Sequence, residues 1–182
     1  MEQEVALGQP RTGPLTGVRV ADFSAIFSGP IAGAMLADQG ADVIKVEAFT
    51  GDLMRKGYPQ SGGMASAFTS MNRNKRGLSV NLQTPEGKAI ATKLIQSADV
   101  VLENFRPGVM DRLGLGYDVF KENHPKLVYA SINGVGSVGP YANRRVYDAV
   151  IQAVSGFTAL RVDGKPEMVN SLICDKVTSL TA

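Results

Sequence analysis

Residues 18–47, VRVADFSAIFSGPIAGAMLADQGADVIKVE, contain the pattern that decides the fold. Two short runs rich in β-branched residues, 18–23 and 42–47, flank a segment of helical pattern, 30–39, which ends at Gly40. Short apolar runs of this kind are typical of buried strands, and a glycine directly after a helical pattern is typical of a helix end. The stretch therefore predicts a βαβ unit.

The alternation of strands and helices continues beyond this unit. Thr84 is a good N-cap residue and is followed by proline and glutamate, so a helix is expected to begin there and to run to 96. Four glycines in 48–74 predict a long loop region. The other expected strands are 77–82, 99–102 and 126–132, and the other expected helices are short ones at 65–71 and 117–123. Strands separated by helices predict an α/β fold, a mostly parallel sheet with helices on both faces.

Length and composition are those of one ordinary globular domain. The chain has 182 residues, of which 44% are hydrophobic and 20% are charged. Residues 1–14 are polar and contain Pro10, Gly13 and Pro14. We therefore expect a flexible N-terminal arm over 1–14 and a single domain over 15–182.

The charges and the rare residue types argue against several classes of partner. The formal net charge is +2, and the 19 Lys and Arg residues are spread without a basic block, which predicts neither nucleic-acid binding nor a membrane anchor. Cys174 has no second cysteine to pair with, and with His124 as the sole histidine no metal site is expected. No signal pattern or long apolar run is present, so we expect a cytoplasmic protein.

Polar residues stand at the carboxyl ends of the expected strands, where parallel sheets bind ligands: Asp22, Glu47, Glu103, Asn104 and Asn133. The segment 134–139, GVGSVG, matches a dinucleotide-binding motif, and together with Glu47 it leaves an oxidoreductase as an alternative. In the dinucleotide fold, however, that motif follows the first strand and opens a helix, whereas here it follows the fifth strand and runs into proline. A glycine loop around a different ligand is favoured.

The segment 169–180, VNSLICDKVTSL, places an acid at the expected start of a helix. One interpretation is that Asp175 caps free backbone N–H groups and is favoured there by the helix dipole. The other is that a carboxylate held ionised by those N–H groups, and partly shielded from water, acts as a nucleophile. The position of Asp175 alone leaves both interpretations open.

Seven ordered blocks resemble the family III CoA-transferases: LTGVRVADFS, SGPIAGAMLADQGADVIKVE, NRNKRGLSVNLQTPEGK, ADVVLENFRPGVMDRLGLGY, ASINGVGSVGPY, YDAVIQAVSG and CDKVTSL. The resemblance covers residues 15–182 and implies a Rossmann-like large domain that takes acyl-CoA as substrate. It also implies a homodimer of interlocked chains. Family members are longer and carry a small domain after the large one, so we expect this chain to be the large domain without its small domain.

The resemblance implies an enzyme that moves CoA from an acyl-CoA donor to a carboxylic acid acceptor through a covalent aspartyl intermediate. Asp175 matches the catalytic aspartate of the family, and Asp148 lies where the family often has an acid close to the reacting centre. The residues that match CoA contacts are Asn74, Lys75 and Arg76 for the nucleotide end, Asn104 and Phe105 for the pantetheine, and Arg112 and Arg145 for the phosphates.

Two positions distinguish activities within the family. Its racemases carry a histidine where this chain has Tyr147, and a tyrosine, which titrates near about pH 10, is a poor base at neutral pH. A transferase is therefore favoured over a 2-methylacyl-CoA epimerase. Phe27 stands where the formyl-CoA enzyme carries a glutamine, which argues against formate or oxalate and for a larger or less polar acyl group. A non-catalytic CoA-binding fragment is the remaining alternative.

Overall fold

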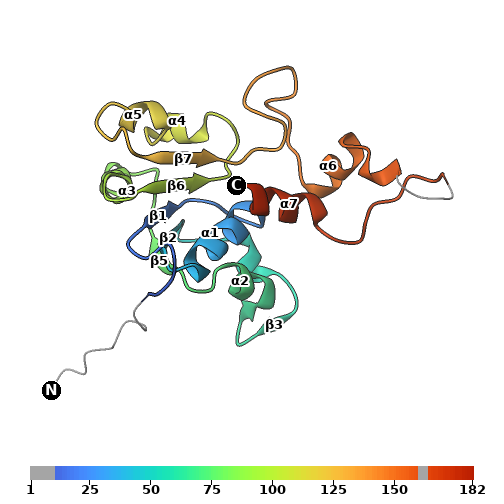
Figure 1. Ribbon diagram of the computed structural model, residues 1–182, viewed down its shortest axis with the longest axis horizontal. Helices are drawn as coiled ribbons and strands as arrows, with labels where there is room; N and C mark the ends of the chain where they lie inside the picture. Colours follow the sequence, from blue (N-terminus) through green and yellow to red (C-terminus); the bar gives the residue numbers. More distant parts are fainter. Residues whose placement is uncertain (1–10, 160–163) are drawn as a thin grey trace.

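The computed structural model describes residues 11–159 and 164–182, and a five-stranded parallel sheet forms its centre (Figure 1). The strands are β1 (Arg19–Asp22), β2 (Asp42–Glu47), β5 (Arg76–Ser79), β6 (Val100–Glu103) and β7 (Val128–Ser131). Their order across the sheet is β5-β2-β1-β6-β7. This is the strand order of a Rossmann-like fold, in which the order reverses between β1 and β6.

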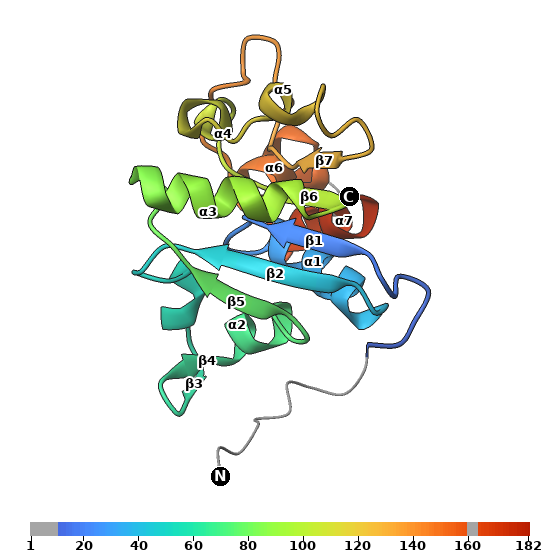
Figure 2. The same ribbon diagram turned by 90° about the vertical axis from the view of Figure 1, so that its left-hand side faces the viewer.

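Helices cover both faces of the sheet, as the sequence predicts (Figure 2). On one face α1 (Ser28–Asp38) packs against α7 (Ile173–Thr181), and α3 (Pro85–Gln96) covers the other face. The remaining elements are η1 (Leu53–Lys56), β3 (Gln60–Ser61), β4 (Met64–Ala65), α2 (Ser66–Met71), α4 (Val109–Leu113), α5 (Tyr117–Phe120), α6 (Asp148–Val154) and η2 (Phe157–Ala159). No helix in the described ranges is long and apolar enough to cross a membrane.

The two central residues of β1 belong to different hydrophobic clusters, one on each face of the sheet. Val20 belongs to the cluster that contains Ala32 and Ala37 of α1, whereas Ala21 belongs to the cluster that contains Ala91 and Ile95 of α3. Neighbouring side chains of a strand point to opposite faces, so the two central residues of a strand covered on both faces are both apolar, here between Arg19 and Asp22. β1 is therefore the centre of both hydrophobic cores.

Most predicted elements are confirmed. β2 has the predicted bounds, and so does α3, whose N-cap Thr84 accepts a hydrogen bond from the Gly87 N–H at 3.1 Å. The other predicted strands and helices are present, with bounds shifted by at most three residues. The strands and helices were predictable because apolar runs and helix caps are sequence patterns that lie within each element.

Three features of the structure were not predicted. The loop region 48–74 contains η1 and the β3–β4 hairpin in addition to the expected short helix. α4 is short and lies between Gly108 and Gly114, which both adopt left-handed conformations. α6 leaves Val150 and Val154 exposed, so its sequence lacks the one-sided apolar pattern that marks a packed helix.

The N-terminal arm, expected over residues 1–14, is described only in part. Residues 1–10 of the expected arm lie outside the described residues. Arg11, the first described residue, already contacts the sheet, because its Nη2 lies 3.3 Å from Oδ1 of Asp42 and its Nη1 donates to the Ala41 carbonyl at 2.5 Å. Arg11 therefore lies against the sheet, at the start of β2.

Two glycines of α1 allow the helix to pass close to the end of β1. A Cβ added to Gly29 would lie 2.2 Å from Cβ of Ser24, and one added to Gly33 would lie 2.8 Å from Oδ2 of Asp22 and 3.0 Å from Nζ of Lys75. The side chains of Ser24, Asp22 and Lys75 are all buried. These glycines therefore serve helix–strand packing, one turn apart, and not a phosphate-binding fingerprint.

We expect Gly29→Ala to lower the free energy of unfolding by about 1–3 kcal/mol, because the added methyl group overlaps the buried Ser24 side chain. Gly77→Ala is the matched control, since a Cβ at Gly77 in β5 would meet no atom within 4 Å, and we expect a change of less than about 0.5 kcal/mol. Urea unfolding measures both. Equal effects of the two substitutions would contradict the close approach at Gly29.

Candidate active site

A pocket of about 350 Å³ opens at the carboxyl edge of the sheet. Its walls are the loops that follow β1, β6 and β7, together with the first turns of α6 and α7. Because the loops after β1 and β6 both line it, the pocket lies where the strand order reverses, the usual ligand site of such sheets. Of the polar residues predicted at this edge, Asn104 and Asn133 line the pocket, whereas Asp22 and Glu47 form ion pairs with Lys75 and Arg55.

Asp175 lines this pocket from the first turn of α7. The N-cap of α7 is Leu172, so Asp175 does not cap the helix, although it lies in the first turn, where the helix dipole favours an acid. Burial raises the pKa of Asp175 and so does the nearby carboxylate of Asp148, while a hydrogen bond from the Ser28 hydroxyl lowers it. The net shift is upward, so Asp175 is a half-buried carboxylate whose charge is poorly stabilised and not one held ionised by helix N–H groups.

Asp148 connects α6 to α7. It is the first residue of α6 and is 5% exposed. Its Oδ2 accepts a hydrogen bond from the backbone N–H of Asp175 at 2.9 Å, and its Oδ1 accepts one from Nε2 of Gln152 at 2.5 Å. Asp148 thus satisfies one of the free N–H groups at the start of α7 and places its own negative charge beside Asp175.

Gln152, which the sequence analysis did not single out, supports this arrangement. It is 2% exposed and lies one turn after Asp148 in α6. Its Oε1 accepts from the Val169 N–H at 2.9 Å, and its Nε2 donates to the Ser171 carbonyl at 3.0 Å. Gln152 therefore fixes both the Asp148 carboxylate and the segment that leads into α7. The only signal in the sequence was its spacing of four from Asp148.

Asn104 and Phe105, predicted as pantetheine contacts, both line the pocket. The Asn104 amide group is already used within the protein: its Oδ1 accepts from the Ala25 N–H and its Nδ2 donates to the Ala25 carbonyl, each at 2.8 Å. The Phe105 N–H donates to Oε2 of Glu103 at 2.8 Å, and burial raises the pKa of that glutamic acid. Asn104 therefore holds the loop after β1, and Phe105 presents its ring to the pocket wall.

Arginines provide the positive charge of the pocket. Arg145, predicted to contact phosphates, lines it with an exposed side chain, and so do Arg144 beside it and Arg106 in the loop after β6. Guanidinium groups bind phosphates with paired hydrogen bonds. Arg112 is exposed on α4 and is not part of the pocket lining.

Asn74, Lys75 and Arg76 are not brought to this pocket. Nδ2 of Asn74 donates to Asp38 at 2.8 Å, and Arg76 pairs with Asp42 at 2.7 Å at the start of β2. The Lys75 side chain is 2% exposed, and its Nζ lies 2.8 Å from Oδ2 of Asp22. Burial lowers the pKa of Lys75, and the Asp22 charge opposes that shift.

Each of these three side chains has a partner within the protein, but only the side chain of Lys75 is buried, and Asn74 and Arg76 are exposed. The pocket, by contrast, combines a half-buried carboxylate whose pKa is raised, a second acid that accepts a hydrogen bond from the backbone N–H of that residue, and several arginines on one edge of a Rossmann-like sheet. This combination suits a substrate with both a phosphate group and a reactive carbonyl.

Comparison with known proteins shows the family. The model of CoA-transferase family III matches residues 15–182. The chain belongs to the family III CoA-transferases. It is 41% identical over 180 residues to the succinate–glutarate CoA-transferase of Agrobacterium fabrum, and the match covers 93% of this chain. It is also 41% identical over 174 residues, 94% of the chain, to the formyl-CoA:oxalate CoA-transferase of Streptomyces avermitilis.

A solved structure shows the same fold. The crystal structure of a CaiB/BaiF family protein from Brucella suis superposes with a TM-score of 0.87 at 37% identity, covering 94% of this chain and 48% of that one. The match covers 45% of the Agrobacterium protein and 42% of the Streptomyces protein. This CoA-transferase chain thus spans less than half the length of these relatives.

The pKa of Asp175 provides a direct test of the site geometry. We expect Asp148→Asn to lower the titration midpoint of Asp175, because the substitution removes a negative charge that raises its pKa. Carbon NMR of the labelled carboxyl groups measures this midpoint. Asp118→Asn is the control, since Asp118 is 81% exposed on α5 and should leave the Asp175 midpoint unchanged. A midpoint that stays the same or rises in Asp148→Asn would contradict the proximity of the two acids.

Proposed function

We propose that this chain provides the acyl-CoA site of a CoA-transferase, and that Asp175 is its nucleophile. The observation that carries the proposal is a half-buried aspartate, whose backbone N–H binds Asp148, in a pocket that also holds Arg144 and Arg145. The match to family III, whose named relatives transfer CoA, supports it. Because the chain spans less than half of those relatives, the activity of the whole protein is part of the proposal.

In the proposed reaction a carboxylate oxygen of Asp175 attacks the thioester carbonyl carbon, the C–S bond breaks, and CoA leaves as a thiolate with the bonding electron pair. The product is a mixed anhydride. The thiolate then attacks the Asp175 carbonyl carbon of the anhydride, which releases the first carboxylic acid and leaves an aspartyl-CoA thioester. A second carboxylate takes the CoA by the same steps in reverse, so no net proton transfer or redox partner is needed.

The raised pKa of Asp175 fits this role. A carboxylate that is poorly solvated is a stronger nucleophile than one surrounded by donors, and it loses less on entering a neutral anhydride. The reactive form is the anion, so the proposed activity is lost as the pH falls. The loss begins at a higher pH than it would for an ordinary aspartate, because the pKa is shifted upward.

The start of α1 supplies candidates for stabilising the oxyanion of the transition state. Phe27 is the N-cap of α1, and both Phe27 and Ser28 line the pocket that contains Asp175. The first N–H groups of a helix have no partner within the helix, and the helix dipole favours negative charge at this end. Donors directed at a developing oxyanion lower the barrier to attack on a carbonyl carbon.

For CoA itself, Arg144 and Arg145 are the proposed phosphate contacts and Phe105 is the proposed contact of the pantetheine arm. Asn74, Lys75 and Arg76 stay proposed nucleotide contacts outside this pocket: Asn74 and Arg76 are exposed beside Asp38 and Asp42, whereas Lys75 is buried beside Asp22. Arg112 remains a second candidate for a phosphate contact from α4.

The epimerase alternative lacks a suitable base. The sequence has one histidine, His124, and its Nε2 lies 2.8 Å from the Ala98 carbonyl, outside the pocket lining. Tyr147 lines the pocket with 70% of its surface exposed. Transfer of CoA between carboxylic acids therefore fits the pocket better than proton transfer at the α-carbon.

The loop after β1 bears on the identity of the acyl group. Ile26 and Phe27 give the pocket an apolar wall near Asp175. We propose an acyl group that is larger or less polar than formyl or oxalyl, because a polar acid would lose hydration against this wall without gaining hydrogen bonds.

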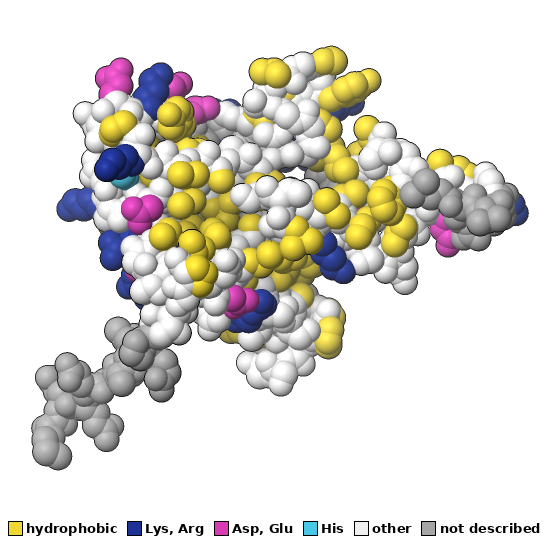
Figure 3. Space-filling view, viewed as in Figure 1, with side chains coloured by type: hydrophobic (Ala, Val, Ile, Leu, Met, Phe, Trp, Pro, Cys, Tyr) yellow, Lys and Arg dark blue, Asp and Glu magenta, His cyan; other side chains and the backbone are white. Residues whose placement is uncertain are grey.

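For the whole protein we also propose a homodimer and a cytoplasmic location, both suggested by the family. Hydrophobic side chains gather over the region of α6 and α7 on the face seen in Figure 3. Val154 is 73% exposed and Leu180 is 69% exposed. Exposed apolar surface of this kind supports a further protein surface covering these helices.

The covalent intermediate provides the test. When the chain is incubated with a panel of acyl-CoA thioesters and hydroxylamine, mass spectrometry is expected to find a hydroxamate at Asp175. Asp175→Asn should lower the labelling rate at least about a thousandfold, because the amide is not nucleophilic. Asp118→Asn, an exposed position, is the control and should be labelled at Asp175 like the unaltered chain. Labelling at another acid, or none on any protein, would contradict the proposal.

A further inference from the structure

The loop after β1 contains a strained residue at the pocket wall. Ile26 has a φ angle of 71°, and both Ile26 and its neighbours Ala25 and Phe27 line the pocket. The left-handed region is unfavourable for residues with a Cβ and least favourable for β-branched ones. Strain of this kind persists only where the surroundings hold the residue in place, and it gathers at functional sites.

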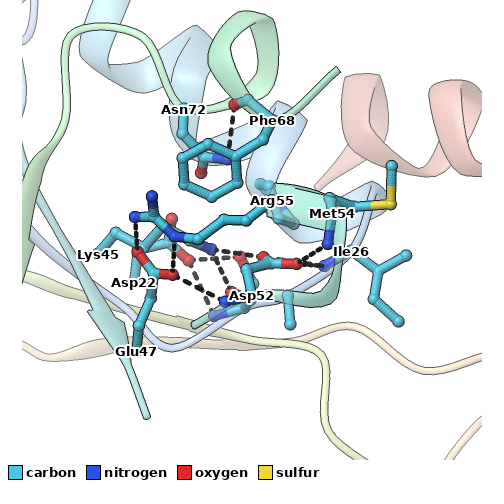
Figure 4. Close-up of polar contacts among 12 residues, drawn as sticks. Asp22, Ile26, Lys45, Glu47, Asp52, Met54, Arg55, Phe68 and Asn72 are labelled. Atoms are coloured by element: carbon cyan, nitrogen blue, oxygen red, sulfur yellow. Dashed lines mark hydrogen bonds and ion pairs between the residues drawn. The ribbon is translucent and has the colours of Figure 1, made fainter. Parts of the chain in front are cut away.

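Asp52 holds Ile26 in this conformation (Figure 4). The Ile26 N–H donates to Oδ1 and Oδ2 of Asp52 at 3.3 and 3.2 Å. Oδ1 of Asp52 also accepts from the Met54 N–H at 2.9 Å, which makes Asp52 the N-cap of η1. The Asp52 side chain is 1% exposed. A buried acid from the 48–74 region therefore binds the backbone of the pocket loop at its strained residue.

Lys45 of β2 completes the arrangement. Its Nζ lies 3.0 Å from Oδ2 of Asp52 and donates to the Ser24 carbonyl at 2.8 Å, and its side chain is 3% exposed. The charge of Asp52 is thus balanced by a lysine that binds the same loop two residues earlier. Either charge would be costly to bury without the other, so the two residues keep each other in place.

The loop is therefore held at consecutive residues by buried side chains. Lys45 binds the carbonyl of Ser24, Asn104 binds both backbone groups of Ala25, and Asp52 binds the N–H of Ile26. Lys45 lies in β2 and Asn104 directly follows β6, and these two strands flank β1. Asp52 comes from the loop region after β2. The next residues, Phe27 and Ser28, begin α1 and border Asp175.

We propose that Asp52, paired with Lys45, is a positioning residue that holds Ile26 in its left-handed conformation and thereby presets the pocket wall and the start of α1. The effect on acyl transfer rests on the proposed function, whereas the effect on the loop does not. A residue that only stabilised the fold would not depend on which side chain stands at position 26.

Substitutions at position 26 provide the test. Asn adopts left-handed conformations readily, whereas Thr is β-branched like Ile, so Ile26→Asn and Ile26→Thr are polar substitutions that differ in their tolerance of positive φ. Asp52→Asn keeps the shape of the side chain and removes its charge. The proteins compared are the unaltered chain, Asp52→Asn, and Asp52→Asn combined with each substitution at Ile26. Hydrogen exchange of the residue 26 amide is the first readout.

We expect Asp52→Asn to raise the exchange rate of the residue 26 amide about tenfold while exchange in β1 and β6 stays unchanged. Adding Ile26→Asn should return the rate to within about threefold of the unaltered chain, and adding Ile26→Thr should not. An unchanged rate in Asp52→Asn, or equal effects of Asn and Thr, would overturn the proposal. If Asp52→Asn does not fold, Ile26→Asn and Ile26→Thr alone decide, because only Asn should slow the exchange.

The rate of hydroxamate formation at Asp175 is the second readout. It should fall about tenfold in Asp52→Asn and recover with Ile26→Asn but not with Ile26→Thr. Recovery of the exchange rate without labelling of any protein would support the role of Asp52 and contradict the proposed function. If the substitutions at position 26 change the amide exchange rate but not the rate of hydroxamate formation, the proposed effect of the loop on acyl transfer is overturned.

Discussion

Most backbone N–H and C=O groups of loop 24–27, which joins β1 to α1, have no backbone partner in a helix or strand. Buried side chains bind them instead, and the rest of the site depends on these hydrogen bonds. Asp22 accepts from the N–H and the hydroxyl of Ser24, and Lys45, Asn104 and Asp52 bind the residues that follow. Buried polar groups without partners are expensive, so each of these side chains is required once the loop is buried. The loop in turn fixes where α1 begins.

The same loop explains why so many charged groups are buried at this edge of the sheet. Lys75 pairs with Asp22, and Lys45 pairs with Asp52, with all four side chains at most 3% exposed. Buried ion pairs contribute little net stability, but breaking one of them is costly. Asp175 differs from these acids, because no cation of the described residues pairs with it and burial raises its pKa. The two acids that hold the loop, Asp22 and Asp52, are therefore neutralised by lysines, whereas the proposed nucleophile has no such partner among the described residues.

Local signals made the fold predictable from the sequence. Thr84 and Pro85 marked the start of α3, and the doubly buried runs marked β1 and β2, because capping and burial involve residues close in the chain. Asp148 and Asp175 were found through their resemblance to a family. Their contact could not be predicted, since it joins α6 and α7 and its two residues lie far apart in the chain.

Other parts of the site could not be predicted, for a common physical reason. Lys75 and Asn74, two of the predicted CoA contacts, have Asp22 and Asp38 as partners within the protein, and a charged or polar side chain in a sequence gives no sign of such a partner. Gln152 and Asp52 act through hydrogen bonds to backbone groups far along the chain, and such contacts leave no spacing pattern. The measurement that tests the central claim most directly is a crystal structure of this chain with a bound acyl-CoA. We predict the thioester carbonyl beside the Asp175 carboxylate, between α7 and the start of α1, with the phosphates at Arg144 and Arg145. A thioester bound away from Asp175 would contradict the claim.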